Sequence, residues 1–376
     1  MIYLFCSAST LLYKRDALRS IAYPAGHIFR YRYLRKYVDR KVLDSLHQYE
    51  GATALLVYAD TLERDGARDF SFYPLRKVNL LRLSSAAGAV YVDFRFGEFV
   101  NYGSDSKKRD SWDEFLKRMP GRPWPPKSTH QGSFLLDVDD EAQITTGDAN
   151  QTDCWGYLVN QLDLSRDLSK STFCLVQGFY YASQDRYGCY SETKLDAIDN
   201  TYDSIYPIPM GESVVLKLLL WRPTYDYDNP DSARKLSIKV GADAFASMSK
   251  NEVCSESRYD EDRTVLVCKR VFDNVLSFVS IEEPGDVGAR SPHLTLLTKV
   301  RVPTWVIAGV VLLVGTGTFL LALDAEFFAF VATFLDGPWR SYLNEYGKVL
   351  ATLTKLAGAV AIAVSTYLAF KRLPIK

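Results

Sequence analysis

Two long apolar runs near the end of the chain form the strongest pattern of hydrophobic and polar positions. Residues 302–323 carry no formally charged side chain, and residues 349–370 carry one, Lys355. A helix as long as the first run would extend about 33 Å, which matches the hydrocarbon layer of a bilayer. The pattern therefore predicts two transmembrane helices, folded as a hairpin behind a globular region.

The region before this hairpin alternates apolar and polar residues with the period of two that is typical of half-buried strands. In residues 28–38, aromatic side chains alternate with Arg30 and Arg32, and Asp39 is expected to cap a short helix that follows. Further strands are predicted at 53–62, 70–75, 78–83, 90–96, 132–138, 173–182, 214–221, 236–240, 264–271 and 275–281, with a helix at 112–119 capped by Ser111. The predicted fold class is mainly β, a barrel-like or sandwich-like region with a few short helices, followed by the α-helical transmembrane hairpin.

Proline-rich and polar segments indicate the domain boundaries. The segment GRPWPPK at 121–127 interrupts both the strand and the helix patterns. We expect an N-terminal β-rich domain at 1–120, a second β-rich domain at 128–285, a linker at 286–301 and the transmembrane hairpin at 302–376.

The charge of the body restricts the classes of partner. Residues 1–300 contain 38 Lys and Arg against 41 Asp and Glu. A body that is not basic is poorly suited to general nucleic-acid binding, so an anion site would have to be local. The six cysteines lack zinc-site spacing, and we expect reduced core thiols rather than disulfides.

The densest basic segment is FRYRYLRKYVDRK at 29–41. On a strand, Arg30 and Arg32 point the same way, and such a pair suits a phosphate or carboxylate ligand. The candidate anion or ligand-binding residues are Arg30, Arg32, Arg35, Lys36, Arg40 and Lys41. The alternatives are a solvated strand face and a surface lying near anionic lipid headgroups.

Motifs for catalysis and for metal binding are missing from the sequence. There is no HExxH, GxSxG, P-loop or dinucleotide-binding fingerprint, and we predict no catalytic residue, no cofactor and no metal. The acidic cluster Asp137, Asp139, Asp140 and Glu141 lacks the spacing of a calcium loop, so a solvated loop is the preferred interpretation. An enzyme whose site assembles only in three dimensions stays open as an alternative.

The hairpin contains small and polar residues that suit helix association. Small residues let two helices approach closely, and a charge within an apolar helix must reach the interface, pair, or face water. The candidate residues for helix packing or a pore are Gly309, Gly315, Gly317, Lys355, Ala357, Ala361 and Ser365. The apolar segment 327–335 between the runs is too short to cross and is expected to lie at the interface.

The basic residues near the two runs predict the orientation. Positively charged side chains are retained on the cytoplasmic side. Arg290, Lys299 and Arg301 precede the first run and Lys371, Arg372 and Lys376 follow the second, whereas the connector has only Arg340 and Lys348. We expect a multi-pass protein of a bacterial inner or plasma membrane, with the body and both termini on the cytoplasmic side.

These features favour a membrane-anchored sensor and effector. Its body would bind an anionic ligand or a protein partner, and its helices would self-associate to permeabilise or signal across the membrane. This plan is similar to that of membrane effectors in prokaryotic antiviral defence and stress systems, a likeness of architecture alone. The alternatives are a tail-anchored scaffold that localises a partner-binding domain and a membrane-tethered hydrolase or nucleotide-binding enzyme.

Overall fold

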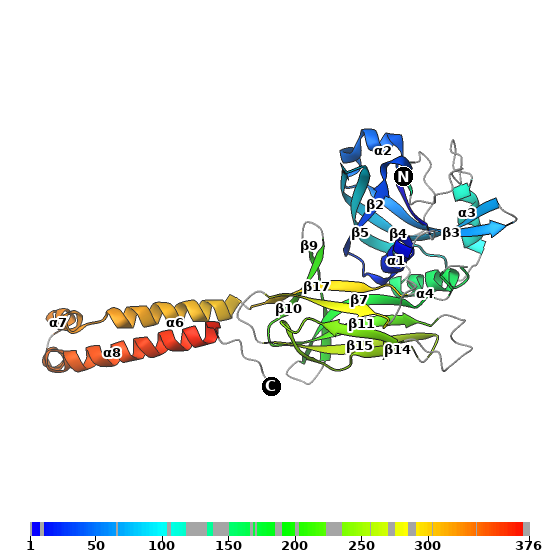
Figure 1. The fold of residues 1–376 in the computed structure, drawn as a ribbon. Coiled ribbons are helices and arrows are strands. Elements are labelled where there is room, and N and C mark those ends of the chain that lie inside the picture. Colours follow the sequence, from blue (N-terminus) through cyan, green and yellow to red (C-terminus); the bar gives the residue numbers. More distant parts are fainter. Residues whose placement is uncertain are drawn as a thin grey trace.

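The computed structural model describes residues 2–370 with gaps. The residues not described in that range are 8–10, 65–66, 104–106, 118–133, 138–149, 166–167, 170, 185–189, 200–202, 223–234, 256, 270–274, 285–290, 303 and 336. The described chain is mainly β, as the sequence predicts. It has two regions of different shape, a broad body of three sheets and a set of helices that extends from one end of the body (Figure 1).

The N-terminal part of the chain forms the first sheet. Its strands, in spatial order, are β2 (Ile28–Leu34), β5 (Ala89–Phe99), β4 (Ala67–Ala86), β3 (Thr53–Arg64), β1 (Ile2–Ser7) and β6 (Phe134–Asp137). All neighbours are antiparallel except β1 and β3. In β2, Tyr31 and Tyr33 are buried while Arg30 and Arg32 are exposed, so the predicted alternation is confirmed.

Short helices surround this sheet. They are α1 (Leu11–Ala22), η1 (Arg35–Tyr37), α2 (Arg40–Asp44), η2 (Leu46–Tyr49) and α3 (Lys107–Lys117). The Asp39 side chain accepts a hydrogen bond from the Lys41 backbone N–H at 3.2 Å, which confirms the predicted cap of α2. Two local predictions were wrong. Residues 67–86 form one long strand rather than two, and Ser111 lies inside α3 rather than at its start.

The remaining strands form two sheets that pack face to face. One sheet contains β14 (Glu252–Cys254), β12 (Lys235–Val240), β16 (Leu276–Glu282), β17 (Leu294–Arg301), β10 (Ser204–Pro209) and β9 (Ile198–Asp199). The other contains β13 (Phe245–Met248), β15 (Tyr259–Cys268), β11 (Ser213–Trp221), β7 (Phe173–Gln184) and β8 (Tyr190–Leu195). The rings of Phe179 in β7 and Tyr206 in β10 lie 5.1 Å apart across the two sheets. Each sheet therefore buries one face of its strands against the other.

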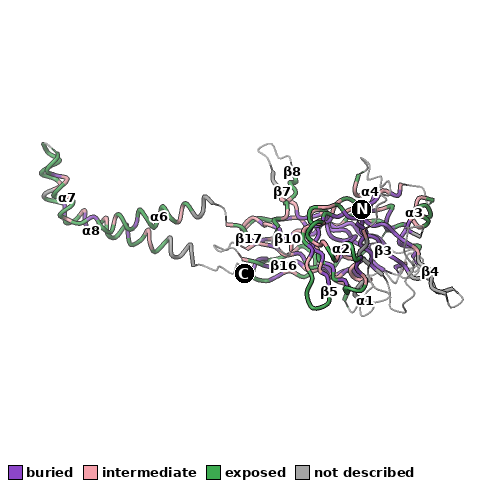
Figure 2. The backbone as a smooth tube through the Cα atoms, turned by 90° about the horizontal axis from the view of Figure 1, so that it is seen from above, coloured by how far each residue is buried: buried purple, intermediate pink, exposed green. Residues whose placement is uncertain are grey.

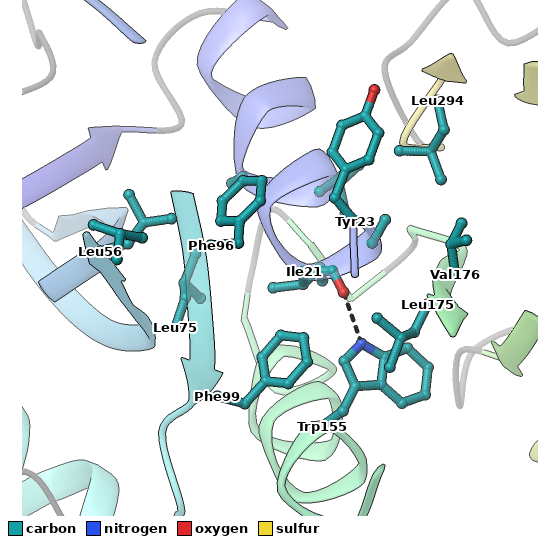
Figure 3. Packing of buried hydrophobic residues seen from close by; sticks show 14 of the residues in the cluster. Ile21, Tyr23, Leu56, Leu75, Phe96, Phe99, Trp155, Leu175, Val176 and Leu294 are labelled. Atoms are coloured by element: carbon teal, nitrogen blue, oxygen red, sulfur yellow. Dashed lines mark hydrogen bonds between the residues drawn. The ribbon is translucent and has the colours of Figure 1, made fainter. Parts of the chain in front are cut away.

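One continuous hydrophobic core joins the first sheet to the two-sheet part. Helix α1 packs against β1 and β4 on one side and against β7 on the other. Helix α4 (Gln151–Leu162) contributes Trp155, which is fully buried and donates its indole N–H to the Ile21 carbonyl at 3.0 Å (Figure 3). Because a buried indole needs a hydrogen-bond partner, this contact fixes α4 against α1.

A buried histidine lies where the two parts meet. The His27 ring stacks on the Tyr23 ring at 4.0 Å, and its Nδ1 lies 3.4 Å from the Tyr206 hydroxyl. Its Nε2 is 3.8 Å from the carboxylate of Asp203. Burial lowers the pKa of His27 to about 3, and the positive charge of Arg76 adds to this shift. His27 is therefore a neutral interface residue at physiological pH.

The predicted linker and the start of the second domain differ from the observed elements. Residues 294–301 form β17, which is paired on both sides, with β16 and β10. Only residues 302 and 303 separate β17 from the first C-terminal helix. Strand β6, expected in the second domain, pairs with β1 in the first sheet. The alternation in both strands is short, so their partners in the sheet could not be read from local sequence.

Candidate functional site: the C-terminal helices and the basic strand

Three helices form the C-terminal region. Helix α6 (Thr304–Ala322) and helix α8 (Pro338–Phe370) lie side by side and extend away from the body, with α7 (Ala325–Thr333) at their far end (Figure 1). Helix α7 is bent by 80° from the described part of α6. The Asp324 side chain accepts the Phe327 backbone N–H at 2.9 Å, so the break coincides with a capped helix start.

Two glycines set the closest approach of α6 and α8. A Cβ added to Gly358 would lie 2.6 Å from the Gly317 carbonyl oxygen and 3.0 Å from the Leu321 nitrogen. A Cβ added to Gly317 would lie 3.3 Å from the Ala361 Cβ. The helix backbones therefore approach at a point where larger side chains do not fit.

The structure separates the small residues singled out by the sequence into two groups. Gly317 and Ala361 lie in the contact between α6 and α8, whereas a Cβ added to Gly309 or Gly315 would meet nothing within 4 Å. Ala357 and Lys355 are exposed on α8. Ser365 lies in α8, but its side chain is outside the described residues. Sequence reasoning overlooked Gly358, although its spacing of three from Ala361 is that of one helix face.

Large apolar side chains are exposed along these helices. Figure 2 shows the helices mostly exposed, in contrast to the buried strands of the body. Leu312 is 71% exposed in α6, Phe330 is 61% exposed in α7 and Leu356 is 63% exposed in α8. Contiguous apolar surface of this kind is rare on monomeric soluble proteins.

Length and composition identify one helical segment that could cross a membrane. Among the described residues it is Glu345–Val364, of which 17% is buried within the chain. The bent pair Ala308–Ala322 and Ala325–Thr333 meets the same criterion only if its two helices are counted as one span.

The basic strand has its arginines in different environments. The Arg30 guanidinium donates two hydrogen bonds to the carboxylate of Asp93 on β5, at 2.5 and 2.8 Å. Asp93 is buried, with 3% of its side chain exposed, whereas 40% of the Arg30 side chain is exposed. Arg32 is exposed on the same face of the edge strand β2, without an ion pair among the described residues. The Arg30 guanidinium is therefore already bound to Asp93, and Arg32 is the arginine of this pair that is accessible to a ligand.

The other basic residues follow on η1 and α2. Arg35 and Lys36 are exposed, and the Lys36 ammonium lies 4.8 Å from the centre of the Tyr37 ring. Arg40 lies 3.8 Å from Asp44, one helical turn away, and both side chains are exposed. Lys41 is also exposed. The basic segment thus presents a solvated surface spread over three consecutive elements.

A pocket in the body was not anticipated. It has a volume of about 420 Å³. Its walls include Asp153 and Tyr157 of α4, Trp221 of β11, Tyr259 at the start of β15 and Arg258 just before that strand. The Arg258 guanidinium lies 4.8 Å above the Trp221 ring and donates to the Asn160 side-chain oxygen at 3.1 Å. Aromatic faces beside a cation and a carboxylate suit a planar polar ligand. There was little indication of this pocket in the sequence, because the segment 255–263, which contains Arg258 and Tyr259, has the composition of a charged turn.

The described residues offer no group of three or more His, Cys, Asp or Glu side chains that could hold a metal ion. Asp137 instead accepts the Tyr49 hydroxyl at 3.0 Å, while Asp139, Asp140 and Glu141 lie outside the described residues. Burial raises the pKa of the Cys6 thiol, and it raises the pKa of Cys174 to about 12. Such thiols remain protonated and are poor nucleophiles.

The chain matches no protein-family model and no curated protein sequence.

Proposed function

We propose that this chain is a membrane-anchored sensor and effector, whose C-terminal helices cross a membrane and associate between copies to permeabilise it. The observation that carries the proposal is the exposure of large apolar side chains along α6, α7 and α8. Each Leu, Val or Phe that stays in water forgoes about 1.5–3 kcal/mol of burial free energy. A lipid environment removes this penalty for all of them at once.

The register of the two long helices supports two spans. The contact between Gly317 and Gly358 places residue 305 near the level of residue 370, and residue 322 at the end of α6 near the level of residue 353. The two apolar runs of the sequence, 302–323 and 349–370, therefore lie side by side over most of their length. Helix α7 then lies at the connector end, where an apolar helix bent by 80° suits the membrane interface.

The proposed orientation places the body and both termini in the cytoplasm. It follows from the excess of Lys and Arg at the body end of the helices over the connector. Trp339, Tyr342 and Tyr346 are exposed at the connector end of α8, the position expected of an interfacial aromatic belt. The membrane that we propose is the inner or plasma membrane of a bacterium.

The body supplies the sensing part of the proposal. Its candidate recognition features are the exposed face of β2 with Arg32 and the pocket beside Trp221 and Arg258. Occupation by an anionic ligand or a protein partner would bring copies together, because one pair of helices cannot enclose a pore. This proposed plan is similar to that of membrane effectors of prokaryotic defence and stress systems, a likeness of architecture alone.

The test is a measurement of membrane integrity in bacteria that express the full chain. Strong expression favours self-association by mass action. A potential-sensitive dye should then report depolarisation, and a DNA-binding dye should enter the cells. The matched control is the chain ending at Arg301, which should leave both signals unchanged. Intact membranes in cells whose membrane fraction contains abundant full-length protein would contradict the effector and leave an anchored scaffold.

A further inference from the structure

Helix α8 has three distinct faces, which follow from side chains spaced three and four positions apart. The first face packs on the neighbouring helices. Ala351 is buried, Gly358 meets the backbone of α6, and a Cβ added to Gly347 would lie 3.5 Å from the Phe328 Cβ of α7. This face is therefore already covered within the chain.

The second face is uniformly large and apolar or aromatic. The side chains of all its members are exposed, by 42–67%. A helix face of large apolar and aromatic side chains is compatible with contact to lipid. They are Trp339, Tyr342, Tyr346, Val349, Leu353, Leu356, Val360 and Val364.

The third face is polar or small from Ser341 to Ala359. Its members alternate spacings of four and three, and all are exposed. They are Ser341, Glu345, Lys348, Thr352, Lys355 and Ala359. No large apolar side chain interrupts this face, although large apolar side chains occupy the neighbouring lipid-compatible face at the same depths.

Lipid is a poor environment for the third face. A lysine within the apolar part of a membrane helix is costly to insert unless its ammonium group reaches water or a partner. Lys348 lies just before the apolar run and can reach the interface, but Lys355 lies seven residues, or about 10 Å, further along the helix. Lys355 is exposed rather than covered by α6 or α7. The position suits water, which stabilises an ammonium group.

We propose that the third face of α8 lines a water-filled lumen shared by several copies of this chain, and that the lumen passes anions. Glu345 and Lys348 are three positions apart at the mouth, where their charges offset one another. Lys355 is then the deepest charge, and a ring of lysines favours anions over cations. This inference rests on the proposed function, since it needs the helices to span and to associate.

The first test measures ion selectivity. The purified full chain is reconstituted in planar bilayers of phosphatidylcholine under a KCl gradient, and the reversal potential is recorded. The wild type should reverse toward the chloride equilibrium potential, Lys355→Glu should reverse toward that of potassium, and Lys355→Gln should lie between them. The matched control is Leu356→Gln on the lipid-compatible face, which should keep the wild-type value. Conductance with a reversal potential indifferent to Lys355 would reject the lumen face while leaving the effector intact.

The second test does not depend on conductance. Single cysteines are introduced at neighbouring positions of equal depth, Thr352→Cys against Leu353→Cys and Ala359→Cys against Val360→Cys. A charged, water-soluble thiol reagent is applied to membranes containing the full chain, and labelling of the wild type is subtracted. Positions 352 and 359 should label several times faster than 353 and 360. Equal labelling within each pair would overturn the inference, and protection of all four without any conductance would also count against the proposed function.

Discussion

The body and the C-terminal helices use the same apolar residue types in opposite ways. In β11 of the body, Val214, Leu216 and Leu218 are fully buried. In α6, Val311 and Leu312 are 64% and 71% exposed. The hydrophobic effect explains why the β11 side chains are buried, whereas the two α6 side chains remain exposed in the single chain. Under the proposed function, this difference corresponds to two solvents, water for the body and lipid for the helices.

The largest expected effect comes from separating the two regions. The described core cluster of the body contains no residue after Val300. The chain ending at Arg301 should therefore keep its fold and pass completely from the membrane fraction to a detergent-free supernatant. Fractionation by ultracentrifugation, with circular dichroism of the supernatant, measures both parts of this prediction. A truncated chain that stays with the membrane would show that the body binds lipid itself.

Within the body, the greatest loss is expected at the buried joint between its parts. Trp155→Ala removes a fully buried side chain and its hydrogen bond to Ile21. We expect the free energy of unfolding to fall by about 3–5 kcal/mol in urea titrations of the chain ending at Arg301. Tyr157→Ala on the same helix is the control, because Tyr157 is 38% exposed. Equal losses for the two variants would contradict the continuous core.

Acid should lower the free energy of unfolding of the body, because His27 is buried in its neutral form. Its folded pKa of about 3 lies below the unfolded value of about 6.5, so below pH 6.5 the unfolded chain binds a proton that the folded chain excludes. Stability from this group is complete above pH 6.5 and falls by about 2 kcal/mol at pH 5. Burial raises the pKa of Asp16 to about 6, which acts in the opposite direction as pH falls. The measurement is therefore the stability difference between wild type and His27→Gln at pH 7 and pH 5, because Asp16 is common to both. A difference that does not change with pH would contradict the prediction.

In the helices, stability should depend on close approach rather than on apolar volume. Gly358→Ala adds a Cβ into the backbone of α6 and should destabilise the helix pair by about 1–3 kcal/mol. Gly309→Ala adds the same group where nothing lies within 4 Å, and it should be neutral or slightly stabilising. Thermal unfolding of the full chain in detergent compares the two variants. Equal stability would indicate that the helices separate in detergent.

The smallest effects are expected on the basic strand. Arg30→Ala breaks the bidentate pair with buried Asp93 and should cost about 1 kcal/mol, a value reduced by the exposure of Arg30. Arg32→Ala should change stability by less than about 0.5 kcal/mol. Urea titration measures both variants in parallel. A larger loss at Arg32 would reveal a structural role for the arginine that we assign to recognition.

The sequence predicted those elements whose pattern stands out locally. The position of β11 was predicted correctly. The alternation at 28–38 predicted where β2 begins, but the strand ends at Leu34 and residues 35–37 form η1. Helix α4 was missed although Cys154, Trp155, Leu158, Val159 and Leu162 have helical spacing after the cap Asn150. Its signal was overlooked because a long polar segment precedes it.

Other elements depend on partners far away in the chain. Strand β10 contains Pro207 and Pro209, which usually argue against a strand. They are tolerated because β9 pairs only with Ser204 and Ile205, and beyond these two residues that edge of β10 has no strand partner in the described part of the chain. The ion pair of Arg30 with Asp93 likewise depends on the register of β2 with β5. Which helix face packs, and hence the role of Gly358, also depends on the position of α6.

The direct connection from β17 to α6 has a mechanical consequence. Strand β17 is held by ladders on both of its edges, to β16 and to β10, and two residues join it to the helix. A pulling force along α6 would therefore act on these hydrogen bonds in shear, rather than first extending a flexible linker. A twist or tilt of the two-sheet part is therefore expected to change the direction of α6, because only two residues separate the strand from the helix.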